Sequence, residues 1–353
     1  MSNVALLPEI VRRVVRARLG GGLAAKARGP KQLPSLSMYF SDPLSDLIAE
    51  EDDIHSERSI RRLSRHVFSC GRSAVVIRYA MPRELTLLRE GQFEKIYLLI
   101  DDDLETLEQS NGLPKDYQQR LIGYRDGPYR RLMEMVTDVV APAENILKAY
   151  ARKRAIHLDP AQCHQAAGLV HHHNIRPFDI VFAATRSHIQ DLGHIASALA
   201  DVLRLRPDAR LTTFLNGHAP RPLRNLPNAI HLPNMEWSRY RAYVAENRFH
   251  AAIAPALDTP FNKARSISKL HDHAALGAAG LYSAQQPFDR IVTHNKSGML
   301  LSNDPDEWRN GLLELAEKRE KTLSLAAGGQ VLSQTLGDIR RVRNFWLREL
   351  QLD

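Results

Sequence analysis

Residues 259–292 read TPFNKARSISKLHDHAALGAAGLYSAQQPFDRIV, and this stretch decides the fold class. A loop with Pro and Asn comes first, and we expect a helix from about Ser266 to Gly277, where the glycine ends it. The short apolar run 280–283 then predicts a buried strand, and a second loop with Pro287-Phe288-Asp289 follows it. A helix, a glycine stop and a buried strand in this order are typical of an α/β sheet.

The same alternation of helices and strands continues on both sides of this stretch. We expect strands at 179–184, 209–215, 229–232 and 251–254, with helices near 191–205, 237–247 and 305–318. Such regular alternation predicts a doubly wound parallel sheet. Ligands of these sheets bind in the crevice at the carboxyl ends of the strands, so the functional site is expected there.

The N-terminal half shows the same pattern over a shorter range. We expect a strand at 74–79, a helix at 84–90, a strand at 95–100, and a helix, strand and helix across 129–149. Residues 155–177 are irregular and rich in histidine, which is typical of a linker. The predicted division is 1–30 (basic amphipathic segment), 31–170 (N-terminal Rossmann-like domain), 171–330 (C-terminal Rossmann-like domain) and 331–353 (C-terminal helix). Together they predict two α/β domains that face a central cleft.

Composition and charge limit the kinds of partner that the chain is expected to bind. The chain has 353 residues, a formal net charge of +8 and a pI near 9.5, which favours polyanionic partners. Only two cysteines occur, Cys70 and Cys163, without metal-ligand spacing, and no apolar run is long enough to span a bilayer. We therefore expect a cytoplasmic protein without a metal site. Residues 6–19 place apolar and Arg residues on different helical faces, which fits either an anionic membrane surface or a helix packed on the protein.

The expected helix at 266–277 carries a polar pattern near its N-terminal end. Ser266, Lys269 and Asp272 (or His273) are three and four residues apart, so they share one face. Free N–H groups, a serine and a lysine attract phosphate, and an acidic residue one turn later can accept hydrogen bonds from ribose hydroxyls. The pattern indicates a nucleotide diphosphate site. A serine cap with a solvated Lys–Asp pair is the alternative.

These residues also resemble a family signature. The stretch is similar to the signature of group 1 glycosyltransferases, which are family 4-like enzymes with the two-domain GT-B fold. The matching positions are Asn262, Lys263, Ser266, Lys269, Asp272, Ala275, Gly277, Ser283 and Gly298. Residues 184–192 resemble the loop that opens the C-terminal domain in the same family. The resemblance covers roughly the 170 C-terminal residues and is much weaker in the N-terminal half.

The resemblance implies a chemistry. Arg186 and Lys269 would neutralise the diphosphate of a nucleotide-sugar donor and stabilise the leaving group, and Asp272 would hold the ribose. His188, in the loop after a strand, is the third catalytic candidate, as an acid/base or a phosphate donor. The further donor-binding candidates are Thr185, Asn262, Ser266 and Asp289. Such enzymes generally retain the anomeric configuration and need neither a metal nor a cofactor.

The resemblance further implies a glycan or lipid-linked acceptor and a place in bacterial cell-surface polysaccharide synthesis. Nucleic acid is not expected as a partner, because the positive charge comes without a nucleic-acid-binding motif. Possible contact with a membrane would place the protein at the inner face of the membrane.

Two positions depart from the family pattern, and one acidic cluster is open to several interpretations. Asp272 stands where a Glu is usual, and Ala264 stands where many relatives have a second Glu. These departures keep open a non-catalytic protein that binds sugar nucleotides or glycans. In residues 101–103, all Asp, Asp101 and Asp103 are acceptor-side candidates, and the alternatives are a helix cap or a Mg²⁺ site.

Overall fold

The computed structural model describes residues 33–49, 58–109, 112–174 and 177–352. Residues 33–353 form one compact unit. The basic segment predicted at 1–30 lies outside the described residues. Within the described ranges, no helix combines the length and the apolar character needed to cross a membrane.

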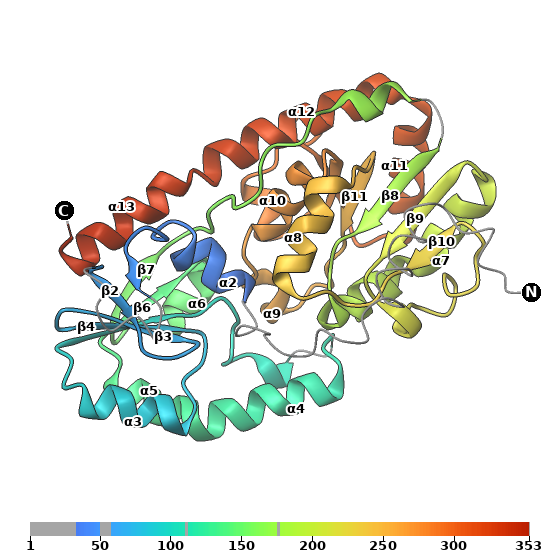
Figure 1. Ribbon diagram of the computed structural model, residues 1–353. Helices are drawn as coiled ribbons and strands as arrows, with labels where there is room; N and C mark the ends of the chain where they lie inside the picture. The colour runs from blue at the N-terminus through green and yellow to red at the C-terminus, as the bar shows by residue number, and fades with distance from the viewer. Residues whose placement is uncertain (1–32, 50–57, 110–111, 175–176, 353) are drawn as a thin grey trace, which may run out of the picture. The chain divides into compact units, whose positions relative to one another are not determined.

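The first sheet has seven strands that follow one another in chain order (Figure 1). They are β1 (Ile48–Ala49), β2 (Ile60–Arg62), β3 (Val67–Cys70), β4 (Ser73–Ile77), β5 (Lys95–Leu99), β6 (Asp138–Ala141) and β7 (Arg154–His157). β3 is antiparallel to β2 and to β4, and the other neighbours are parallel. The predicted α/β layer is confirmed, but this sheet is sequential rather than doubly wound. The connections on either side of β3 are too short for a crossover, and Gly71 turns one of them with a φ of +53°.

Helices and loops cover both faces of the first sheet. Alternate residues of β5 point to opposite faces: Leu98 packs with the helices that follow the strands, and Tyr97 packs on the other side. The helices of the first side are α3 (Pro82–Glu90), α4 (Lys115–Tyr124), α5 (Arg130–Met135) and α6 (Glu144–Ala149). On the other side lie α2 (Pro34–Leu36), Tyr39, Phe40 and the last helix of the chain, α13 (Ile339–Leu350).

The second sheet has six parallel strands in the order β10-β9-β8-β11-β12-β13. They are β8 (Phe178–Phe182), β9 (Ala209–Thr213), β10 (Ala229–His231), β11 (Ala251–Ala254), β12 (Ala279–Ser283) and β13 (Met299–Leu301). The helices between and after them are α7 (Ile189–Leu205), α8 (Trp237–Glu246), α9 (Pro260–Lys263), α10 (Ser268–Ala275), α11 (Pro305–Glu317) and α12 (Arg319–Leu336). This order confirms the predicted doubly wound sheet, and its direction reverses between β8 and β11.

The structure confirms one predicted helix with shorter bounds and corrects another. The helix expected from about Ser266 to Gly277 is α10, and the loop expected before it contains the short α9, which Thr259 caps by accepting a hydrogen bond from Asn262 N–H at 3.2 Å. The C-terminal helix expected from residue 331 is broken at Gly337. Asp338 starts the next helix by accepting a hydrogen bond from Arg340 N–H at 3.0 Å. An Asp beside a Gly favours a helix start over helix continuation.

The end of the chain joins the two sheets. α12 packs on α10 and β12, and α13 then lies on the first sheet (Figure 1). Trp346 of α13 is fully buried, and its ring packs edge-on against Phe40 and Tyr97. The linker between the sheets runs beside this crossing, since Gln162 N–H donates to the carbonyl of Gly337 at 2.8 Å.

Candidate functional site

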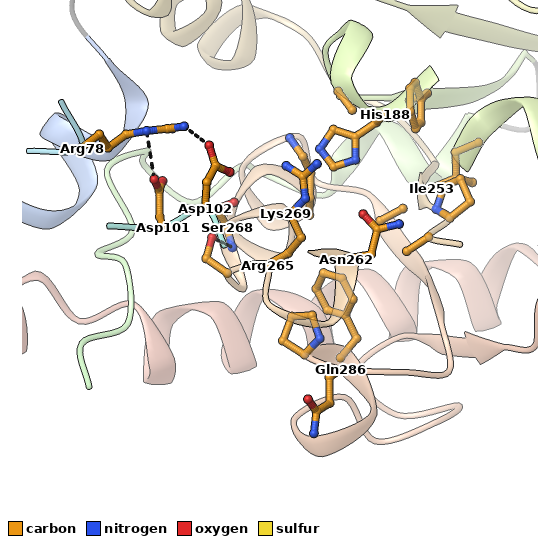
Figure 2. Close-up of a pocket in the computed structure, with 18 residues that line it drawn as sticks. Arg78, Asp101, Asp102, His188, Ile253, Asn262, Arg265, Ser268, Lys269 and Gln286 are labelled. Carbon is orange, nitrogen blue, oxygen red and sulfur yellow. Dashed lines mark hydrogen bonds and ion pairs between the residues drawn. The ribbon is translucent and has the colours of Figure 1, made fainter. Parts of the chain in front are cut away.

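A cavity of about 750 Å³, counted with the open space at its mouth, lies at the carboxyl ends of β8 and β11 (Figure 2). This is the place where ligands of doubly wound sheets bind. Residues from both sheets line it. They are Arg78, Asp101, Asp102, Phe182, Ala184, His188, Ile253, Ala254, Pro255, Ala256, Asn262, Arg265, Ser266, Ser268, Lys269, Gln286, Pro287 and Phe288.

Arg265 lies in the cavity wall and forms no ion pair with the carboxylates of the described residues. Its Nε and Nη2 are buried without a hydrogen-bond acceptor, and its guanidinium lies over the ring of Phe261 at 4.7 Å. A buried donor without an acceptor is costly, and a buried charge without a partner more so. Arg265 is therefore poised to bind an anion. It follows α9 by two residues and lies in the loop that was expected before the helix at 266–277.

Lys269, in the first turn of α10, is the second cation of the same wall. Its Nζ donates to the carbonyl of Ala183 and, at 2.8 Å, to the carboxylate of Asp272. A lysine has three donors, so one remains for a ligand. Asp272 is 7% exposed and does not line the cavity. Asp272, the residue predicted to bind the ribose, is thus on the side of Lys269 that faces away from the cavity.

His188 lines the cavity from the loop between β8 and α7. Its Nδ1 lies 3.1 Å from Asp191 Oδ2, and the other oxygen of Asp191 accepts hydrogen bonds from Leu257 N–H and from the side-chain amide of Asn262. Burial, followed by the charge of Arg265, lowers the pKa of His188 to about 4. Asn262, a predicted donor-binding residue, thus forms part of the support behind the histidine.

The opposite wall belongs to the first sheet and is acidic. Arg78 directly follows β4 with a φ of +65°, and its guanidinium pairs with Asp101 (3.1 Å) and Asp102. Ser35 also donates to Asp101 at 2.6 Å. One guanidinium faces two carboxylates, so this wall carries the opposite charge to the Arg265–Lys269 wall. Burial tends to lower the pKa of Arg78, but the two carboxylates hold it above the ordinary range.

The other predicted residues lie in three different places. Ser266 lines the cavity, as expected for a donor-binding residue. Thr185 and Arg186 line a separate hollow, where Arg186 pairs with Asp116. Asp289 is exposed and lies outside the cavity wall.

Asp103 has a local structural role. Its carboxylate accepts hydrogen bonds from the N–H groups of Glu105 and Thr106 and from the Thr106 hydroxyl. The predicted acidic cluster therefore separates, since Asp101 and Asp102 face the cavity and Asp103 caps the following turn. Among the described residues, no group of three or more His, Cys, Asp or Glu side chains is arranged as a metal site.

Ala264, where many relatives of the resembled family have a Glu, is 1% exposed. With Phe261, it packs in the apolar core between the first sheet and its helices. A carboxylate at position 264 would lie in this core rather than in the cavity. The alanine at position 264 thus belongs to the contact by which α9 packs against the core of the first sheet.

Comparison with known proteins adds the fold class. No protein-family model and no curated protein sequence matches the chain. Among solved structures, HepE from Anabaena in complex with UDP-glucose is similar with a TM-score of 0.54 and 11% identity, over 79% of this chain and 79% of HepE. Sucrose-phosphate synthase from Thermosynechococcus elongatus is similar with a TM-score of 0.55 and 12% identity, over 79% of this chain and 72% of that one.

TarM is similar with a TM-score of 0.51 and 8% identity, and the match covers 72% of this chain but only 50% of TarM. The chain therefore spans about half the length of TarM. These neighbours have the GT-B fold of glycosyltransferases. At such low identity the likeness establishes the fold, and the chain accordingly has the predicted GT-B fold.

Several cavity residues were not predicted from the sequence. Arg265, Asp102 and Arg78 carry most of its charge, and Gln286 and Phe288 close one side. A positive φ at an arginine and a break between two short helices leave no clear trace in sequence periodicity. The Arg265-x-x-x-Lys269 spacing was a usable signal, because it sets two cations one turn apart.

Proposed function

We propose that the chain is a glycosyltransferase that binds a nucleotide-sugar donor in the cavity between the two sheets. One observation carries the proposal: Nε and Nη2 of the half-buried Arg265 are buried without an acceptor, in the same cavity wall as Lys269, at the switch point of a doubly wound sheet. A diphosphate would supply the missing acceptors. The GT-B fold supports the same assignment.

The basic wall suits the leaving diphosphate of a glycosyl transfer, and the acidic wall suits the hydroxyl groups on the other side. Negative charge develops on the leaving diphosphate, where Arg265 and Lys269 would stabilise it. Asp101 and Asp102 offer hydrogen-bond acceptors for hydroxyl groups on the other side. We further propose that transfer retains the anomeric configuration and needs no metal, and that it builds a bacterial cell-surface polysaccharide. These three statements rest on the family resemblance.

A thermal-shift screen of the full chain against nucleotides and nucleotide sugars tests the proposal. We expect one or more nucleotide sugars to raise the Tm, because a ligand that binds only the folded state stabilises it. The best donor is then incubated with glycan and lipid-linked acceptors, and the anomeric coupling of the product is read by NMR. If no nucleotide sugar raises the Tm, the proposal is rejected.

A non-catalytic protein that binds sugar nucleotides is the second candidate. It is favoured by the alanine at position 264, which supplies no carboxylate, and by the pairing of Asp272 with Lys269, which leaves Asp272 outside the cavity wall. Donor binding without transfer or donor hydrolysis across a broad acceptor panel would favour this candidate.

We also propose that the basic segment 1–30 brings the chain to a lipid-linked acceptor at an anionic membrane surface. The support is the sequence alone, in which arginines alternate with apolar residues at 6–19. Flotation with vesicles that contain anionic lipid, compared with zwitterionic vesicles, tests this proposal. If the chain does not bind the anionic vesicles, or binds both kinds equally, the proposal is rejected.

A further inference from the structure

We propose that His188 binds the diphosphate as an imidazolium held by Asp191, so that each donor molecule brings one proton into the site. The inference rests on the proposed function, because the diphosphate is that of the donor proposed above.

The pair is rigidly built. Asp191 is 2% exposed and accepts three hydrogen bonds, from His188 Nδ1–H at 3.1 Å, Leu257 N–H at 2.9 Å and Asn262 Nδ2–H at 2.8 Å. The carboxylate therefore fixes the plane of the imidazole and leaves the hydrogen of the ring on Nδ1.

The second nitrogen of the ring is available. Nε2 has no hydrogen-bond partner among the residues that the structure describes, and His188 lies in the cavity wall beside Arg265 and Lys269 (Figure 2). In the neutral ring this nitrogen carries a lone pair. This lone pair would face the oxygens of a bound diphosphate. Both are hydrogen-bond acceptors, so they would repel each other.

The charges around the ring explain why the proton arrives with the ligand. Asp191 on α7 is the only carboxylate that pairs with the ring in the described chain, and Arg265 and Lys269 face it from the segment around α10. Asp101 and Asp102 lie across the cavity and are paired with Arg78. Burial and the two cations lower the pKa of His188 to about 4, against the opposing effect of Asp191, so the ring is neutral near pH 7.

A diphosphate reverses this balance. It neutralises Arg265 and Lys269, and it accepts a hydrogen bond from a protonated Nε2. Both effects favour the charged ring. One proton from the solvent then joins Nε2, and the imidazolium bridges Asp191 and the phosphate.

Isothermal titration calorimetry with UDP-glucose tests the inference on the full chain. A nucleotide sugar holds its diphosphate as a diester, which does not titrate near neutral pH, so any proton uptake belongs to the protein. Titrations in two buffers of different ionisation enthalpy give the number of protons. We expect about one proton per bound molecule near pH 7, and an affinity that rises about tenfold for each unit of falling pH while uptake is complete.

Three variants separate binding from structure. His188→Gln is expected to lose the proton uptake and the pH dependence of the affinity, and Asp191→Asn to reduce both. His194→Gln is the matched control, since His194 is an exposed residue of α7 whose ring is hydrogen-bonded to the carbonyl of Asn303 and does not line the cavity. It should behave as the wild type.

The outcomes distinguish this inference from the proposed function. If UDP-glucose does not bind, the nucleotide sugar with the largest thermal shift replaces it, and if none binds, the proposed function fails and takes this inference with it. Donor binding without proton uptake, or with equal uptake by His188→Gln, overturns only the role of His188.

Discussion

The indole Nε1–H of Trp346 donates a 2.6 Å hydrogen bond to the carbonyl of Tyr39, which fastens the last helix of the chain to the beginning of the described structure. Both residues are fully buried on the first sheet. The C-terminal helix is therefore part of the core of that sheet.

Replacement of Trp346 by Ala should lower the free energy of unfolding by about 3–5 kcal/mol, because it removes a fully buried aromatic side chain. Trp346→Phe should cost about 1–3 kcal/mol, since it leaves the Tyr39 carbonyl without its donor. Urea denaturation measures both. Arg340→Ala, on the exposed side of the same helix, should change stability little, and a similar loss there would contradict the assignment.

Arg265→Gln should weaken nucleotide-sugar binding by about 10- to 100-fold, because a charge-assisted hydrogen bond to phosphate contributes about 1.5–3 kcal/mol. Calorimetric affinities measure the effect. The matched control is Lys263→Ala, which removes a neighbouring cation that pairs with Asp258 and does not line the cavity. Equal affinities for wild type and Arg265→Gln would exclude Arg265 from the site.

Asp272→Asn tests whether this carboxylate acts through Lys269 or on the ribose. Because Asp272 lies behind Lys269, we expect its loss to weaken binding of a nucleotide sugar and of inorganic pyrophosphate by similar factors, roughly tenfold. Competition binding with the two ligands measures this. A loss confined to the ribose-containing ligand would instead support the predicted ribose contact. Asp201→Asn, on an exposed part of α7, serves as the control.

Ala264→Glu restores the family residue but should not restore a sugar contact. Its side chain would enter the packed core of the first sheet, and overpacking with a buried carboxylate should cost about 3 kcal/mol or more. Thermal and urea unfolding test the cost. Ala242→Glu adds the same group at an exposed site and should be tolerated. A stable Ala264→Glu variant with stronger donor binding would refute this account.

Two buried histidines, His172 in the linker and His250 directly before β11, should make the fold sensitive to acid. Burial lowers the pKa of His172 to about 4 and that of His250 to about 3, and both rings are hydrogen-bonded to backbone groups. The unfolded chain binds protons near pH 6.5, so stability is present above that pH and is lost as the pH falls toward about 4. The loss should approach about 1.4 kcal/mol per pH unit for each ring.

Urea denaturation between about pH 7.5 and pH 4.5 measures this dependence. In His172→Asn, whose amide can still donate to the carbonyl of Gly277, the slope should be smaller. An unchanged slope would show that other groups control the acid sensitivity.

The second sheet was predictable from the sequence and the first only in part. β8, β11 and β12 are short apolar runs that are buried on both faces, which is the clearest pattern a parallel sheet leaves. β7 is an edge strand with exposed side chains, so the sequence at 154–157 looked like part of the linker. Local periodicity in the sequence does not show which strand lies at the edge of a sheet.

The site was predictable to the level of its elements but not of its side chains. The predicted residues Lys269, Ser266 and His188 line the cavity, and each follows a strand or lies near the start of a helix. Arg186 lines a separate hollow, where it pairs with Asp116. Which member of a polar loop faces a cavity depends on backbone angles that tertiary contacts set.

The hydrogen bond from Gln162 to Gly337 joins the two segments of the chain that pass between the sheets. It is one of several such contacts, because Trp237 of α8 also donates to Ser37 at 2.8 Å and Arg241 of α8 pairs with Asp42 at 2.7 Å. The acidic wall and the basic wall of the cavity are therefore braced against each other by bonds that lie outside the cavity itself.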